Sequence, residues 1–145
     1  MVLHLDHCPD IDLCKEVIDA GWSSVLMDVS ALPDEQVEPV LSEICSYAHE
    51  RGATVEIEVE NILGVEDGVG TDEVLRSCTV DELVDIAKRT GADLLAPQLG
   101  TAHGLYKSDP VLQPERAGEF AARTDIPIVL HGGTGLSDAD FATFI

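Results

Sequence analysis

Basic residues are scarce in this 145-residue sequence, which has 8 lysines and arginines against 28 aspartates and glutamates. The formal net charge of −20 would repel a phosphate backbone, so we do not expect nucleic-acid binding. Long apolar runs are also missing, and none approaches the roughly 18 residues that a membrane helix needs. The N-terminus lacks the basic region and apolar stretch of a secretory signal. We therefore expect a cytoplasmic protein with no membrane partner.

No two of the four cysteines form a C-x-x-C pair. Without an export signal, we expect Cys8, Cys14, Cys45 and Cys78 to be reduced thiols. Cys8 follows His7 directly, and we interpret it as a small buried hydrophobic residue. The hydrophobic content of 45% indicates a folded globular chain, and 145 residues suffice for one domain with a sizeable core.

Three segments repeat one order of features: a polar helix, a glycine and an apolar strand. The glycines are Gly21, Gly52 and Gly91, each just past a predicted helix end, where glycine takes the left-handed conformation at no steric cost. A fourth copy has Asp125 in place of the glycine, and Pro127 precedes its strand. Strands that alternate with helices in this way predict an α/β fold with a parallel sheet.

Five strands and five helices follow from this repeat. The strands are expected at residues 2–6, 23–29, 54–59, 93–99 and 127–131, and the helices at residues 10–20, 34–51, 79–90, 114–124 and 137–144. Segments 60–78 and 100–113 are rich in glycine and polar residues, and we expect both to be long loops after strands. Parallel α/β folds carry their chemistry at those strand ends. We see no linker, so residues 1–145 are expected to form a single domain.

Three of the five histidines stand at predicted strand ends. His7 ends the first strand, His103 follows the fourth and His131 ends the fifth. In a parallel sheet these ends face the same way, so the three imidazoles can meet at one point. A lone histidine at a strand end is usually structural, but three at equivalent ends predict a shared metal. Three neutral histidines with an open fourth position make a catalytic zinc site.

Other polar residues accompany this set. Asp6 precedes His7, where its carboxylate could shuttle protons beside a metal or could instead orient a histidine. His4 is on the same strand and is expected to pack against or support the site. His49 is expected to lie on a helix surface.

Acidic residues also mark the second and third predicted strands. Asp28 ends the second strand, and Glu56, Glu58 and Glu60 alternate with apolar residues along the third, so the glutamates share one face. If that face is buried, neighbouring carboxylates repel one another and take up protons unless a cation compensates them. The alternative is an exposed edge strand with a solvated acidic face.

The two predicted loops add further candidates. Glu66 and Asp67 lie between glycines, which indicates a mobile loop suited to bringing a base over a bound substrate, or else an ordinary acidic loop. The glycine-rich segment 132–135 follows His131, and its backbone amides could cradle a phosphate at a helix N-terminus. Lys107 could meet a phosphate or be exposed to solvent.

The motifs LHLDH, VEIEVENILGVED, GTAHGLYK and VLHGGTG occur in this order. Together they resemble the class II fructose-bisphosphate and tagatose-bisphosphate aldolases over essentially the whole chain. The resemblance implies a (β/α)8 TIM barrel fold, of which this chain is a fragment of about five βα units, the third to seventh strands. It also implies a lyase of glycolysis, which cleaves a ketose 1,6-bisphosphate reversibly to dihydroxyacetone phosphate and glyceraldehyde 3-phosphate. We expect the full-length protein to form a homodimer or homotetramer, and the isolated fragment to be inactive.

The resemblance also implies roles for individual residues. Asp6 would pass a proton at the aldehyde-derived oxygen, and Glu66 would take the proton from the carbon of dihydroxyacetone phosphate. Ligands of the catalytic zinc and of an alternative metal position would be His7, His103 and His131, with Glu58 and Asp28. The substrate phosphate and a monovalent cation, sodium or potassium, are expected at Gly104, Lys107, Gly132, Gly133 and Thr134.

The sequence departs from the family pattern at several positions. Glu60 and Leu63 stand where glycine is frequent, and Thr134 replaces the commoner serine but keeps the hydroxyl. Two other functions stay open. A different metal-dependent barrel enzyme, such as a hydrolase, would act through zinc-bound water without needing a phosphorylated ketose. A non-catalytic zinc-binding remnant would bind metal without exchanging any proton of dihydroxyacetone phosphate.

Overall fold

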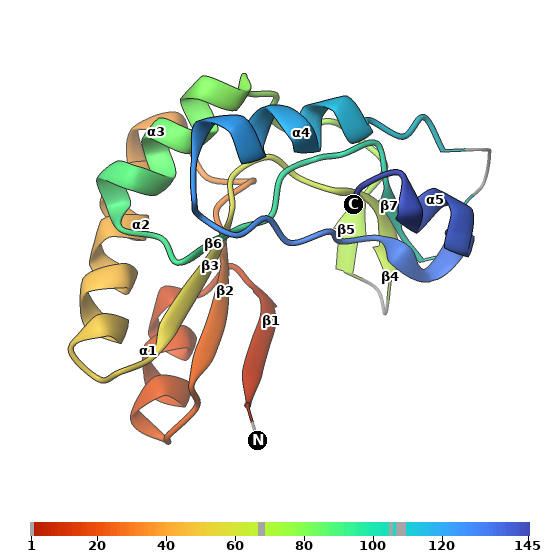
Figure 1. The fold of residues 1–145 in the computed structure, drawn as a ribbon. Helices are drawn as coiled ribbons and strands as arrows, with labels where there is room; N and C mark the ends of the chain where they lie inside the picture. The colour runs from red at the N-terminus through yellow and green to blue at the C-terminus, as the bar shows by residue number, and fades with distance from the viewer. Residues whose placement is uncertain (1, 67–68, 105, 107–109) are drawn as a thin grey trace.

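The computed structural model describes residues 2–66, 69–104, 106 and 110–145. Its main sheet is parallel, and its strands are β1 (His4–Cys8), β2 (Ser24–Asp28), β3 (Thr54–Glu58) and β6 (Leu94–Leu95). Their order in space is their order along the chain (Figure 1). A parallel bridge between Leu95 and Ile128 adds the next segment beside β6. The predicted α/β class with a parallel sheet is confirmed.

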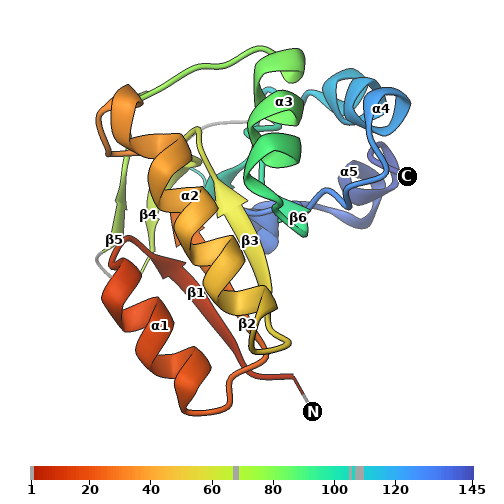
Figure 2. The same ribbon diagram turned by 90° about the vertical axis from the view of Figure 1, so that its left-hand side faces the viewer.

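The helices are α1 (Ile11–Asp19), α2 (Asp34–His49), α3 (Val80–Thr90), α4 (Pro114–Arg123) and α5 (Asp138–Ala142). Helices α1 and α2 lie in front of strands β1 to β3 in Figure 2, and α3 and α4 continue the row. Between the helices and the sheet is the core, where Val25, Val55 and Ile57 are fully buried. Among the described residues, no helix has both the length and the apolar character needed to cross a membrane.

The helix ends follow the local signals in the sequence. Thr79 and Glu82 form a capping box at the start of α3, and Gly91 ends this helix with φ = 81°. Ser137 and Asp140 form a second box at α5. The four cysteines are unbridged, and Cys8 is buried as predicted.

The prediction of a long loop at residues 60–78 was wrong in part. This segment contains a hairpin of β4 (Leu63–Glu66) and β5 (Val69–Thr71), and β4 pairs in parallel with β7 (Ala102–His103) inside the second predicted loop. The close pairing depends on Gly64, which has φ = 106°, because a Cβ there would overlap the backbone of His103. The two loops are therefore joined as a small sheet.

The predicted strands 93–99 and 127–131 were too long. Strand β6 covers two residues, and residue 128 makes a single bridge. Beyond β6, backbone N–H groups donate to side-chain oxygens rather than to a neighbouring strand. The backbone N–H of Gln98 donates to the Glu60 carboxylate (3.2 Å), and that of Gly100 donates to the Gln98 side chain (2.8 Å). Pro127 has no N–H to donate. Both effects withdraw backbone groups from a regular ladder.

Candidate metal centre

Strand β1 ends in a β-bulge that turns His7 into the site. Leu5 pairs with Val25 and Cys8 with Met27, so Asp6 and His7 together oppose one residue of β2. His7 has φ = 44°, a left-handed conformation that is uncommon for a residue with a side chain. Backbone of this kind gathers at ligand and active sites, where the surrounding structure holds it in place.

Three imidazoles from distant parts of the chain meet at this point. The ring centroid of His7 lies 4.6 Å from that of His103 and 4.8 Å from that of His131, and the other pair is 5.7 Å apart. One nitrogen from each ring lies within 4.8 Å of the other two. The convergence predicted from the strand ends is therefore present, and the arrangement can hold one ion.

A second group of possible ligands shares His7. Asp28 and Glu58 are paired in register at the ends of β2 and β3, and one oxygen of each lies within 4.8 Å of a nitrogen of His7. Glu58 Oε2 is 3.4 Å from His7 Nδ1 and, among the described residues, has no hydrogen-bond partner. Asp28 Oδ1 accepts from the amide and hydroxyl of Ser30 at 3.0 and 2.7 Å. Glu58 and Asp28 thus lie close enough to His7 for the three side chains to hold one ion.

Electrostatics in this group favour a cation. Burial, together with the charge of Asp28, raises the pKa of Glu58 to about 8. Burial lowers the pKa of the His7 imidazole, despite the opposing charge of Asp6. Burial has the largest single effect on His131 and acts to lower its pKa, but the hydrogen bond to Glu56 and the charges of the nearby carboxylates together raise that pKa. A neutral His7 offers its lone pair to a metal and contributes no positive charge beside an ionised Glu58.

Glu56 is a site residue that the sequence analysis did not single out. Its Oε1 lies 2.7 Å from Nε2 of His131. The alternative of a solvated acidic face on the third strand is wrong, because Glu56, Glu58 and Glu60 are 5%, 2% and 3% exposed. Glutamate at every second position of an otherwise apolar strand was the signal that marks all three.

A cavity of about 830 Å³ opens in front of these groups. Asp6 lines it with a side chain that is 63% exposed, and its Oδ1 is 3.9 Å from His7 Nε2. Asp6 is thus accessible to a molecule in the cavity. The backbone of Glu66 ends β4, which runs beside the strand of His103. Asp67 and Lys107 lie outside the described residues.

The glycine-rich segment after His131 packs against β7. A Cβ on Gly132 would come within 2.6 Å of the Ala102 carbonyl oxygen, and the Gly132 carbonyl accepts from the Tyr106 hydroxyl at 2.6 Å. Gly133–Gly135, which includes Thr134, form a 3-10 turn, and α5 begins later, at Asp138. The helix expected at residues 137–144 is present as α5, and the glycine segment before it forms a separate short turn. Gly104 follows His103 with φ = 72°.

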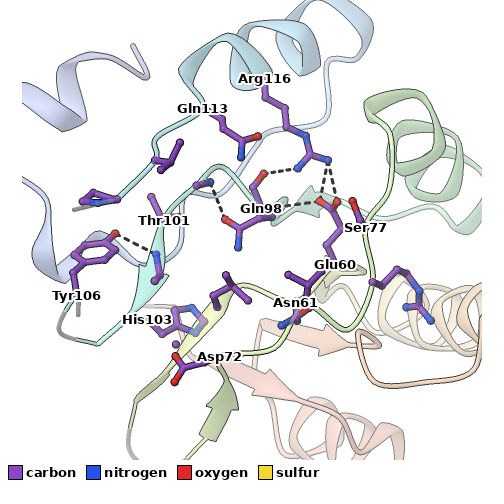
Figure 3. Close-up of a pocket in the computed structure, with 18 of the residues that line it drawn as sticks. Glu60, Asn61, Asp72, Ser77, Gln98, Thr101, His103, Tyr106, Gln113 and Arg116 are labelled. Atoms are coloured by element: carbon purple, nitrogen blue, oxygen red, sulfur yellow. Dashed lines mark hydrogen bonds and ion pairs between the residues drawn. The ribbon is translucent and has the colours of Figure 1, made fainter. Parts of the chain in front are cut away.

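The third glutamate faces a different cavity. Figure 3 shows this pocket of about 710 Å³, with Glu60 at one end and His103 at another. Glu60 is paired with Arg116 at 3.0 Å, and the same guanidinium donates to the Cys78 carbonyl at 2.9 Å. The ion pair ties the end of β3 to α4 and to the segment before α3. No local pattern in the sequence indicated it.

The comparisons with known proteins agree with this geometry. The sequence model of the family "Fructose-bisphosphate aldolase class-II" matches residues 1–145. The fructose-bisphosphate aldolase of Staphylococcus epidermidis is 42% identical over 140 residues, which are 97% of this chain and 49% of that protein. The enzyme of the same name from Geobacillus stearothermophilus is 42% identical over 136 residues, 94% of this chain and 47% of that protein.

Solved structures show the same likeness. A Coccidioides immitis structure, described as that of a fructose-1,6-biphosphate aldolase, superimposes with a TM-score of 0.88 at 29% identity, covering 99% of this chain and 52% of the other. The YdjI aldolase of Escherichia coli K12 gives 0.80 at 29% identity, covering 99% and 49%. The chain spans about half the length of the curated relatives it matches. It belongs to the class II fructose-bisphosphate aldolase family.

Proposed function

We propose that the protein containing this chain is a class II ketose-bisphosphate aldolase, a lyase of glycolysis that works in the cytoplasm. Its reaction is the zinc-dependent, reversible cleavage of a ketose 1,6-bisphosphate to dihydroxyacetone phosphate and glyceraldehyde 3-phosphate. The observation that carries the proposal is the meeting of His7, His103 and His131 within 4.8 Å. Membership of a family that is generally metal-dependent supports it.

The residues present fit a zinc ion. Three imidazole nitrogens with an open fourth position are the donor set of catalytic zinc. The buried Glu58 Oε2, which has no hydrogen bond among the described residues, also fits a nearby cation. His7, His103 and His131 would hold the ion, and Glu58 with Asp28 would offer an alternative position. When bound, the metal supplies Lewis-acid polarisation of the substrate carbonyl.

Two carboxylates are proposed to move protons. Asp6 is exposed in the cavity beside His7, so it can hold or release a proton at the aldehyde-derived oxygen. Glu66 is proposed as the base for the carbon of dihydroxyacetone phosphate. Gly64, two residues before it on β4, is paired with His103, which supports a place for Glu66 near the centre.

Backbone amides are proposed to bind the substrate phosphate, since a chain with 20 excess negative charges must neutralise such a ligand locally. The residues proposed to bind this phosphate are Gly104, Lys107, Gly132, Gly133 and Thr134. A sodium or potassium ion is proposed to bind at the same place. The packing of Gly132 against Ala102 supports the proposal, because it joins the segments that follow His103 and His131.

The fold itself is proposed to be part of a barrel wall, the third to seventh strands of a (β/α)8 barrel in one partial domain. Strands that follow chain order, with consecutive helices packed in a row, support this arrangement. The outer edge of β1 would then need a further strand. We expect the 145-residue chain alone to aggregate with little turnover, and the complete protein to be a homodimer or homotetramer. A cooperative melt with aldolase activity from the isolated chain would contradict the first expectation.

One experiment tests the function. Using the complete gene product, the exchange of the carbon-bound proton of dihydroxyacetone phosphate with solvent is measured with and without a chelator. Exchange should stop with the chelator, return with zinc and disappear in His103→Ala. His49→Ala is the matched control, because His49 is exposed on α2 and bonds to Asp93 at 2.9 Å.

Unchanged exchange in His103→Ala would rule out its assigned role. Hydrolysis without any need for a phosphorylated ketose would instead indicate the hydrolase. Metal binding without proton exchange in the unaltered protein would indicate the non-catalytic remnant.

A further inference from the structure

A chain of polar contacts lies behind the candidate metal centre and links Ser24 on β2, His4 on β1, Glu56 on β3 and His131. We propose that Glu56 and His4 are positioning residues: Glu56 orients the His131 ring so that its Nδ1 binds the cation, and His4 holds Glu56 in place. The inference rests on the proposed role of His131 as a ligand. Neither Glu56 nor His4 would touch the substrate or the metal.

The first step concerns the two nitrogens of His131. Nε2 lies 2.7 Å from Glu56 Oε1, and an ionised carboxylate can only accept a hydrogen bond. Nε2 therefore carries the proton, and Nδ1 keeps the lone pair in the neutral ring. Nδ1 is also the atom that faces His7, because it lies 3.1 Å from His7 Nε2. The bond to Glu56 thus selects the tautomer and the ring edge that a metal needs.

The second step concerns rigidity. Glu56 lies within β3, whose ladder pairs it with Leu26 on one side and Leu94 on the other. His131 follows Ile128, which makes a single bridge, so no regular strand holds the ring. A bond from the middle of the sheet to this less regular segment fixes the third ligand relative to the first two. Such outer contacts commonly orient metal-binding histidines and raise metal affinity.

The third step concerns the other oxygen of Glu56. Oε2 lies 3.8 Å from Nε2 of His4, and Nδ1 of His4 is hydrogen-bonded to the Ser24 hydroxyl at 2.8 Å. His4 and Ser24 are also register partners in β1 and β2. At 3.8 Å the His4 ring forms an ion pair with Glu56 when it is protonated, and in either state it occupies the space into which the carboxylate would rotate away from His131. This arrangement gives His4 a definite task in supporting the site.

Zinc affinity of the complete gene product tests the proposal. It is measured without substrate, by competition with a coloured chelator, in the wild type, Glu56→Gln and Glu56→Ala. We expect Glu56→Ala to weaken zinc binding about 10- to 100-fold, and Glu56→Gln, which keeps an acceptor oxygen, to weaken it less. Glu60→Gln is the matched control, because Glu60 is equally buried but pairs with Arg116, and its zinc affinity should equal that of the wild type.

A second measurement identifies which nitrogen of His131 binds the metal. A purely structural role of Glu56 would leave this result unchanged. In protein labelled with nitrogen-15 in histidine and loaded with cadmium-113, the metal should couple to Nδ1 of His131 while Nε2 stays protonated. In Glu56→Ala, coupling should divide between the two nitrogens. Coupling to Nε2 of His131 in the wild type would overturn the proposal.

The remaining outcomes are equally definite. Glu56→Ala with a wild-type melt in the metal-free state and wild-type zinc affinity would overturn the role of Glu56. His4→Ala should weaken zinc binding, and unchanged affinity would overturn the part given to His4. If the unaltered protein does not bind zinc, the proposed function itself is refuted. If it binds zinc with an affinity that Glu56→Ala does not change, only this inference is refuted.

Discussion

The buried carboxyl of Glu58 should destabilise the metal-free protein, and Glu58→Gln should relieve that destabilisation. The Glu58 side chain is 3% exposed, and burial followed by the charge of Asp28 raises its pKa from 4.5 to about 8. Between these two pH values the folded protein holds a proton that the unfolded chain releases. Stability therefore falls as pH rises through this window.

The size of the effect follows from the shift. Each pH unit in the window lowers the free energy of unfolding by about 1.4 kcal/mol, so by pH 7 the loss reaches about 3 kcal/mol. Glutamine carries no charge at any pH and escapes this loss. His7 acts in the opposite sense below pH 6.5, because its lowered pKa makes stability rise with pH there. His131, whose pKa is raised, acts in the same sense as Glu58 above pH 6.5, so the comparison uses the difference between the variant and the wild type.

The assay is denaturant unfolding of the complete gene product in excess chelator, at several pH values. Glu58→Gln should match the wild type near pH 5 and exceed it by about 3 kcal/mol at pH 7. Glu35→Gln, an exposed position on α2, serves as the control and should show no such divergence. Zinc should shrink the difference, because a nearby cation favours the ionised carboxylate. If metal-free Glu58→Gln is no more stable than the wild type at pH 8, the reasoning fails.

Two further substitutions test contacts that hold the segments around the centre together. Gly64→Ala should lower stability by about 1–3 kcal/mol in thermal melts and abolish most proton exchange, because its Cβ would overlap the backbone of His103. The control, Gly118→Ala, has open space around it on α4 and should be neutral or slightly stabilising in the same melts. Arg116→Met should cost about 3–5 kcal/mol in urea unfolding by leaving Glu60 buried without its partner. Adding Glu60→Gln to Arg116→Met should recover most of that loss, and no recovery would show that the guanidinium acts through packing alone.

The sequence was informative wherever a local rule decides the structure. The capping box at Thr79 and the left-handed Gly91 set the ends of α3 within one residue of the prediction. The meeting of His7, His103 and His131 was predictable because parallel strands bring their carboxyl ends to one edge. Neither argument requires knowledge of which side chains touch.

Features decided by distant partners were not predictable in this way. The bulge that turns His7 inward depends on the pairing between β1 and β2. Arg76 donates to the carbonyls of Val29 and Val59, both at 3.1 Å, and so holds the predicted loop against two strand ends. An arginine in a polar segment gives no sign of this task, because these two backbone acceptors are 17 and 47 residues away.

The three glutamates at positions 56, 58 and 60 support the proposal that the centre holds a metal. All three are buried, so each charge requires a partner. Glu60 has the guanidinium of Arg116, and Glu56 has the ring of His131, whose pKa it raises. Glu58 faces Asp28 and a His7 whose pKa is lowered, and the Ile62 amide and the charge of His131 offset its burial only in part. The same alternation that buries the glutamates thus leaves Glu58 as the carboxylate that the proposed metal would compensate.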